Sequence, residues 1–228
     1  MSKNLKTRVE TDSLGEIKVP KDALWGAQTQ RAIENFPISG IKFKFPFGRS
    51  FLKALGVIKY SAAIANNDLG ILSNKKSEAI KSAAKKVING DVDDHFPIDI
   101  FQTGSGTSTN MNANEVIANL ASAKLKDQIS PNDEVNMTKS SNDTIPTAIC
   151  ISALLDMKEL LIPGLDVLIK EIDKKEAKLK GVVKTGRTHL MDAMPIEFSQ
   201  ELSAWSAQLR GCKNSLNSST STSFSVIS

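Results

Sequence analysis

The chain has 228 residues, 40% of them hydrophobic, so it can bury a core in one large domain or in two smaller ones. Its 29 basic and 25 acidic residues are scattered and leave a net charge of +4. Because no basic stripe with interleaved aromatic residues occurs, we expect no nucleic-acid partner and only a mild attraction to anionic metabolites.

Cysteine usage and hydropathy indicate a reducing compartment. The cysteines are Cys150 and Cys212, with no CxxC pair and no histidine nearby, so neither a zinc site nor a disulfide framework is expected. Residues 1–16 contain no apolar core of a signal peptide, and no stretch approaches the roughly 18 apolar residues of a membrane span. The sequence therefore predicts a cytoplasmic protein without a membrane partner.

The first half of the chain predicts short extended pieces and then helices. Residues 1–48 are irregular, with one alternating run that ends at Pro20 and one short helical turn within residues 23–36. From Phe51 to Leu69 the apolar residues step by three and four, which is typical of a helix that Gly70 ends. A second helix covers residues 80–88 and ends at Gly90.

The stretch from Phe101 to Glu115, FQTGSGTSTNMNANE, is rich in glycine, hydroxyl and amide side chains. Glycine permits close backbone approach to a ligand, and hydroxyl groups both donate and accept hydrogen bonds. Such a segment suits an oxygen-rich anion. The alternative is a polar loop that caps the following helix, with Thr107 or Thr109 as N-cap; it explains one hydroxyl and not the others, so we favour a ligand site.

Two further polar segments follow, each beside a long helix. Residues 130–147 precede an apolar seam that we expect to end at Pro163-Gly164, before another helix from Leu165 to Leu179. Residues 184–197 form the next polar segment, which we expect to be a loop between two helices. Narrow apolar seams on long helices predict packing against other long helices.

The segment 184–197 also contains an acid–base candidate. Arg187, Thr188, His189 and Asp192 lie close together in sequence, and a histidine beside a hydroxyl group suits proton transfer. An apolar seam then runs from Phe198 to Leu216. After it, residues 218–228 hold eight Ser or Thr in eleven positions, a low-complexity end.

Together, these segments resemble the class II fumarase branch of the fumarase/aspartase superfamily over residues 8 to about 216. The matching segments are RVETDSLGEIKVPKDALWGAQTQRAIENFPISG, QTGSGTSTNMNANEVIANLA, SSNDTIPTA and GRTHLMDAMP. The resemblance implies a mainly α fold: a mostly helical N-terminal domain with short extended pieces (1–138), the first long helices of a central bundle (139–216) and a divergent tail (217–228). It also implies a homotetramer whose active sites each collect residues from three chains.

The resemblance further implies reversible hydration of fumarate to malate, a step of the tricarboxylic acid cycle. Fumarases have His after Arg-Thr where aspartases have Gln, and this chain has His189, which favours a hydratase over the alternative, an aspartate ammonia-lyase. No metal or organic cofactor is implied. The resemblance assigns His189 and Thr188 to catalysis, and it assigns substrate binding to Ser105, Gly106, Thr107, Ser140, Ser141, Asn142 and Thr188.

The chain departs from the family pattern at three places. In the secondary dicarboxylate site, formed by Ser130, Pro131, Asn132 and Asp133, Ser130 stands where the family has His. Lys139 replaces a usual glutamine and is either a cation near the substrate oxygens or a solvated lysine. The Gly-Ser-Ser-x-Met-Pro loop, which supplies the proton-abstracting serine, is absent from the sequence.

The missing loop predicts that the chain is an N-terminal fragment, as a frame change or a premature stop after about Leu216 would produce. A third alternative therefore accompanies the hydratase and the ammonia-lyase. The chain would then be a catalytically inactive remnant, or a module that assembles with a full-length subunit.

Overall fold

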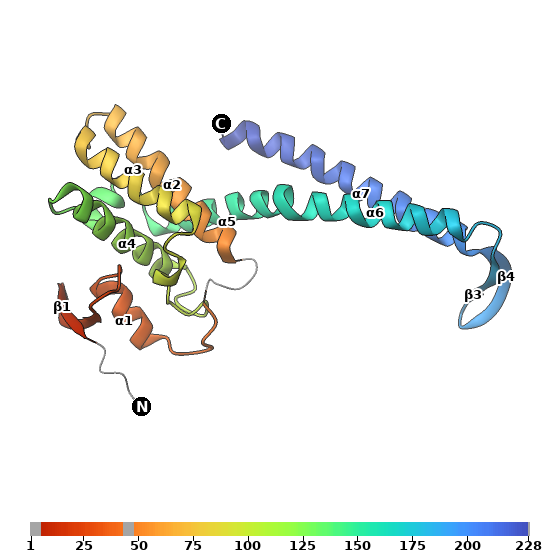
Figure 1. Ribbon diagram of the computed structural model, residues 1–228, viewed down its shortest axis with the longest axis horizontal. Helices are drawn as coiled ribbons and strands as arrows, with labels where there is room; N and C mark the ends of the chain where they lie inside the picture. The colour runs from red at the N-terminus through yellow and green to blue at the C-terminus, as the bar shows by residue number, and fades with distance from the viewer. Residues whose placement is uncertain (1–5, 43–47, 228) are drawn as a thin grey trace. The chain divides into compact units, whose positions relative to one another are not determined.

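The computed structural model describes residues 6–42 and 48–227, which form two compact units, residues 1–153 and 154–228 (Figure 1). Helices dominate both units and each contains one small antiparallel hairpin, so the predicted mainly α fold is confirmed. The elements that begin in the first unit are β1 (Thr7–Asp12), β2 (Gly15–Pro20), α1 (Ala27–Asn35), α2 (Gly48–Asp68), α3 (Asn74–Asn89), η1 (Asp93–His95), α4 (Thr107–Leu125), η2 (Pro131–Val135) and α5 (Ser141–Asp156).

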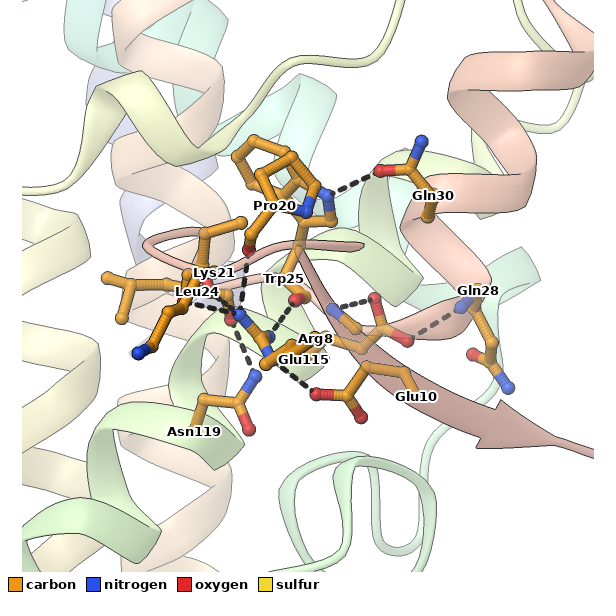
Figure 2. A network of polar contacts seen from close by, with 12 residues as sticks. Arg8, Glu10, Pro20, Lys21, Leu24, Trp25, Gln28, Gln30, Glu115 and Asn119 are labelled. Carbon is orange, nitrogen blue, oxygen red and sulfur yellow. Dashed lines mark hydrogen bonds and ion pairs between the residues drawn. The ribbon is translucent and has the colours of Figure 1, made fainter. Parts of the chain in front are cut away.

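The N-terminal hairpin is fastened to the segment before α1 by Arg8. Its guanidinium donates to the backbone carbonyls of Pro20, Lys21, Ala23 and Trp25 at 2.7–3.0 Å (Figure 2). An ion pair joins Arg31 of α1 to Asp12 at 2.9 Å. Because one side chain donates to four carbonyls, the segment before α1 keeps a single conformation although it has no regular secondary structure.

Helices α2 and α3 lie side by side and form the apolar core with α4 (Figure 1). The residues at the centre of this core are almost fully buried: Leu52, Leu55, Ile80, Val87, Val116 and Ile117. Gly70 and Gly90 follow α2 and α3 with φ of 74° and 89°, the left-handed conformation that glycine adopts without strain. The predicted ends of both helices are confirmed.

Helix α4 brings polar side chains into this core. Asn112, Asn114 and Glu115 are buried beside Val116 and Ile117. The Glu115 carboxylate accepts hydrogen bonds from the backbone N–H groups of Gly26, Gln28 and Thr29 at 2.9–3.0 Å (Figure 2). Glu115 therefore caps the start of α1 from 86 to 89 residues away in sequence, and its charge complements the positive end of the helix dipole.

The second unit pairs two long helices that a hairpin connects. Its elements are η3 (Met157–Leu161), α6 (Ile162–Lys178), β3 (Val183–Thr188), β4 (Met191–Glu197) and α7 (Phe198–Ile227). Helices α6 and α7 pack along each other, and Asp173 of α6 accepts from Ser206 of α7 at 2.6 Å. The hairpin lies at the ends of these helices (Figure 1).

Two expectations for the second unit are wrong. Residues 184–197 are not a loop, because β3 and β4 pair in register from Val183↔Glu197 to Thr188↔Met191. Pro163-Gly164 does not end a helix, because η3 continues into α6 and Pro163 occupies its first turn, where no N–H donor is required. The proposed domain boundaries are not tested and remain predictions. Helix α7 extends into the low-complexity tail as far as Ile227, and Ser228 lies outside the described residues.

The cap on α1 gives a prediction about stability. An added Cβ at Gly26 would lie 2.9 Å from Glu115 Oε1, whereas one at Gly104 meets nothing within 4 Å. We expect Gly26→Ala to lower the free energy of unfolding by about 1–3 kcal/mol, because the buried carboxylate must leave its donors. Gly104→Ala, the matched control, should change it by less than ~0.5 kcal/mol. Equal urea unfolding curves for the two variants would contradict this role of Glu115.

Candidate functional site

The start of α4 is a turn with hydroxyl groups on its surface. Gly106 precedes the helix with φ of 69°, and no side chain caps it, so the alternative of a Thr107 or Thr109 cap is wrong. The Thr109 N–H instead donates to Gln102 Oε1 at 2.8 Å, which anchors the loop to the helix. The hydroxyls of exposed Ser105 and half-buried Thr107 lie 2.8 Å apart, where solvent or a ligand can reach them.

The start of α5 lies directly against this turn. Ser140 precedes the helix, and Ser141 and Asn142 form its first turn. Asn110 Nδ2 of α4 donates to Ser141 Oγ at 2.9 Å. A Cβ on Gly106 would meet Ile145 of α5 at 3.2 Å, so glycine also permits the close approach of the two helices. The structure thus brings together two predicted site segments that are about 30 residues apart in sequence.

This arrangement suits an anion. Two helix N-termini lie close together there, and each presents backbone N–H groups and the positive end of a helix dipole. The hydroxyls of Ser105, Thr107, Ser140 and Ser141 add further donors. Because Ser141 Oγ already accepts from Asn110, its own proton remains to be donated to another acceptor. The chemistry available is recognition of a small molecule rich in carboxylate oxygens.

A buried amine is linked to the start of α4 through Asn136, which also accepts a hydrogen bond from Asn110. Lys59 of α2 is fully buried, and its Nζ donates to Asn136 Oδ1 at 2.7 Å. Burial, and to a smaller extent the charge of Lys139, lowers the pKa of Lys59 from 10.5 to about 6. Lys139 is half-buried and donates to the Met137 carbonyl at 2.9 Å, and burial lowers its pKa to about 8. The alternative of a freely solvated Lys139 is therefore wrong.

Lys59 and Asn136 were not among the site residues that the sequence predicted. A signal was available, because Lys59 follows Leu52 and Leu55 at the helical spacing of the buried face of α2. A lysine at such a position is rarely fully buried.

Thr188 and His189 belong to the second unit. Thr188 ends β3 and His189 begins the turn to β4; both side chains are exposed, and His189 has φ of 51°. Beside them, Arg187 forms an exposed ion pair with Asp192 at 3.3 Å. Their catalytic roles stay predictions.

In the predicted secondary dicarboxylate site, two of the four residues are hydrogen-bonded to each other and the other two line a cavity. Ser130 Oγ donates to Asp133 Oδ2 at 2.8 Å and accepts from the Asp133 N–H at 3.1 Å, so it caps η2. Pro131 and Asn132 line a cavity of about 650 Å³ that also borders Glu115.

Across residues 6–42 and 48–227, no group of three or more His, Cys, Asp or Glu side chains is arranged to hold a metal ion. Within those same ranges, no helix has both the length and the apolar character that a bilayer crossing requires.

Comparison with known proteins supplies the family. A protein-family model described as lyase matches residues 15–227. The chain belongs to this lyase family. It is 55% identical over 217 residues to a class II fumarate hydratase of Xylella fastidiosa, and 55% identical over 207 residues to one of Halobacterium salinarum. These relatives confirm the resemblance to class II fumarases.

Solved structures agree with this relationship. The chain superimposes with a TM-score of 0.86 on the class II fumarase of Schistosoma mansoni, at 39% identity, covering 94% of this chain and 46% of that protein. It gives the same TM-score with the fumarate lyase:delta crystallin of Brucella melitensis, at 41% identity, covering 95% of this chain and 51% of the other. The match to the Xylella enzyme covers 95% of this chain and 45% of that enzyme, so the chain spans less than half the length of this relative.

The buried amine predicts a pH-dependent stability. The pKa of Lys59 is about 6 in the folded state and 10.5 ordinarily. At pH values between these two, the amine is protonated in the unfolded state and mostly neutral in the folded state. The free energy of unfolding therefore rises with pH across this range. Lys59→Met removes the contribution. We expect the variant to be more stable than the wild type near pH 6, with an advantage that shrinks towards pH 9. Urea unfolding of both proteins across this range checks the prediction, and a difference independent of pH would contradict it.

Proposed function

We propose that the chain contributes the carboxylate-binding part of a fumarate hydratase, which adds water reversibly to fumarate to give malate. The observation that carries the proposal is the Asn110–Ser141 hydrogen bond at 2.9 Å, which joins two helix N-termini and their hydroxyl groups. Fumarate is a four-carbon dianion, and such a cluster of donors matches one of its carboxylates. The names of the relatives, class II fumarate hydratase, support the same substrate.

The chemistry of hydration explains why fixed donors would accelerate it. In the malate-to-fumarate direction, removing a proton from the carbon next to a carboxylate builds further negative charge on that carboxylate. Donors from Ser105, Thr107, Ser141 and Asn142 would stabilise this charge more than that of the ground state. In the same proposal, His189, assisted by Thr188, acts on the water or on the proton that the water delivers. The family resemblance supports these two roles.

The finer assignments belong to the same proposal. His189 in place of the aspartase glutamine favours water over ammonia as the added molecule. We further propose a cytoplasmic homotetramer in the tricarboxylic acid cycle, with no nucleic-acid or membrane partner. The second dicarboxylate site at residues 130–133, without the family histidine, would bind weakly at most.

The test uses the purified chain with two ligands. Fumarate conversion is followed by the loss of its absorbance, and binding of the unreactive dicarboxylate succinate is followed by calorimetry. Succinate binding is the expected result, because the chain contributes the carboxylate-binding part while its sequence lacks the serine loop. Conversion to malate would exclude a catalytically inactive remnant. Binding without conversion would favour the non-catalytic assembly module. If the chain neither binds succinate nor converts fumarate, the proposed function is wrong.

His189 gives a prediction about rate. Replacement of a positioned acid–base group typically lowers the rate by roughly 10²- to 10⁴-fold. We expect His189→Asn to fall in this range when the chain is assayed together with a complementary C-terminal piece that carries the serine loop. Because His189 is exposed in the turn, the substitution should leave the melting temperature unchanged. Lys75→Ala, at an exposed position of α3, is the control and should keep the full rate. An unchanged rate in His189→Asn would remove this residue from the mechanism.

A further inference from the structure

Lys59 is in an environment that disfavours a lysine. Its side chain is fully buried in the same helix as the core residues Leu52 and Leu55. The acceptor for its amine is one neutral amide oxygen, and the neighbouring charge is that of another lysine, Lys139. Among the described ion pairs, none includes Lys59. A buried amine without a carboxylate partner costs stability, so packing alone does not explain this residue.

A chain of hydrogen bonds leads from this amine to the candidate site. Asn136 Oδ1 accepts from Lys59 Nζ at 2.7 Å and from Asn110 Nδ2 at 3.3 Å. Asn110 Nδ2 uses its other proton on Ser141 Oγ at 2.9 Å. At the opposite side of the Asn136 amide, its Nδ2 donates to the Lys139 carbonyl at 2.8 Å.

The direction of each bond follows from the chemistry of the groups. The Lys139 carbonyl can only accept, so the NH₂ group of Asn136 faces it and the oxygen of the same amide faces Lys59. Asn110 must then present its NH₂ group, because its oxygen would face another acceptor. Ser141 Oγ consequently accepts within the protein, and its proton is left for an outside acceptor.

We propose that Lys59 is a positioning residue for carboxylate binding: acting through Asn136 and Asn110, it orients the Ser141 hydroxyl as a donor to the ligand. The inference rests on the proposed function, since it assumes that Ser141 contacts a carboxylate. This role explains why the protein keeps an amine in an apolar core, where the amine lowers the stability of the fold. Binding sites commonly retain such groups at the expense of stability.

The test combines three variants with two readouts. Lys59→Met removes the amine, Ser141→Ala removes the hydroxyl, and the double variant removes both. We expect Lys59→Met to weaken succinate binding roughly tenfold, as the loss of one ordered hydrogen bond does, while the melting temperature stays equal or rises. If Lys59 acts through Ser141, the double variant should bind no more weakly than Ser141→Ala alone. Lys75→Met, at an exposed lysine, is the control and should bind succinate like the wild type.

A second measurement keeps the proposal separate from the proposed function. The side-chain amide signals of Asn110 and Asn136 in nuclear magnetic resonance spectra should both shift in Lys59→Met, whether or not succinate binds. If the wild type fails to bind succinate, the proposed function is lost while these signals still decide whether Lys59 orients the two amides. Asn136→Ala interrupts the same chain at a half-buried position and replaces Lys59→Met if that variant does not fold.

Four outcomes would overturn the proposal. In the first, both amide signals stay unchanged in Lys59→Met. In the second, the losses of affinity from Lys59→Met and Ser141→Ala add in the double variant, because additive losses mean independent actions. In the third, Lys59→Met loses stability together with affinity, as a merely structural lysine would. Full succinate affinity in Asn136→Ala would count against the proposal equally.

Discussion

The first unit depends on one constraint: a polar group in an apolar core is costly unless it makes hydrogen bonds there. Helix α4 carries Glu115 and Asn112 into that core. Glu115 finds its partners in the first N–H groups of α1, and Asn112 finds one in the His95 carbonyl at 3.0 Å. Asn119, one turn beyond Glu115, reaches the Leu24 carbonyl at 2.7 Å. Each contact fixes an irregular segment that could not order itself.

The same constraint builds the candidate site. Asn110 lies on α4 one turn before Asn114 and is almost fully buried, yet its amide joins η2 and α5 through Asn136 and Ser141. Polar groups buried in this way stabilise little, but they favour one arrangement, because any other would break the hydrogen bonds from Asn110 to Asn136 and Ser141. The helix that organises the fold therefore also sets the geometry at the anion site.

Local sequence signals predicted the elements that depend on local physics. Apolar residues at helical spacing identified α2 and α3, and Gly70 and Gly90 marked their ends, because a left-handed residue strongly favours glycine. Prediction failed where a partner outside the segment decided the conformation. Residues 184–197 are polar enough for a loop, but pairing of β3 with β4 orders them. Pro163-Gly164 is typical of a helix end, but Pro163 lies in the first turn of α6. A proline there lacks only its backbone N–H group, which has no acceptor within the first turn of a helix.

By itself, the sequence determined the family, the mainly α fold and the polar segments from which a site is built, since these depend on residue types in a fixed order. Only the tertiary structure decided which of those groups meet and which proton remains available. The hydroxyl of Ser141 is a donor to the outside because Asn110, 31 residues earlier, fills its acceptor role. Asn136 is in turn held by Lys59, 77 residues before it. Hydrogen-bond direction depends on partners distant in sequence, and no local pattern contains that information.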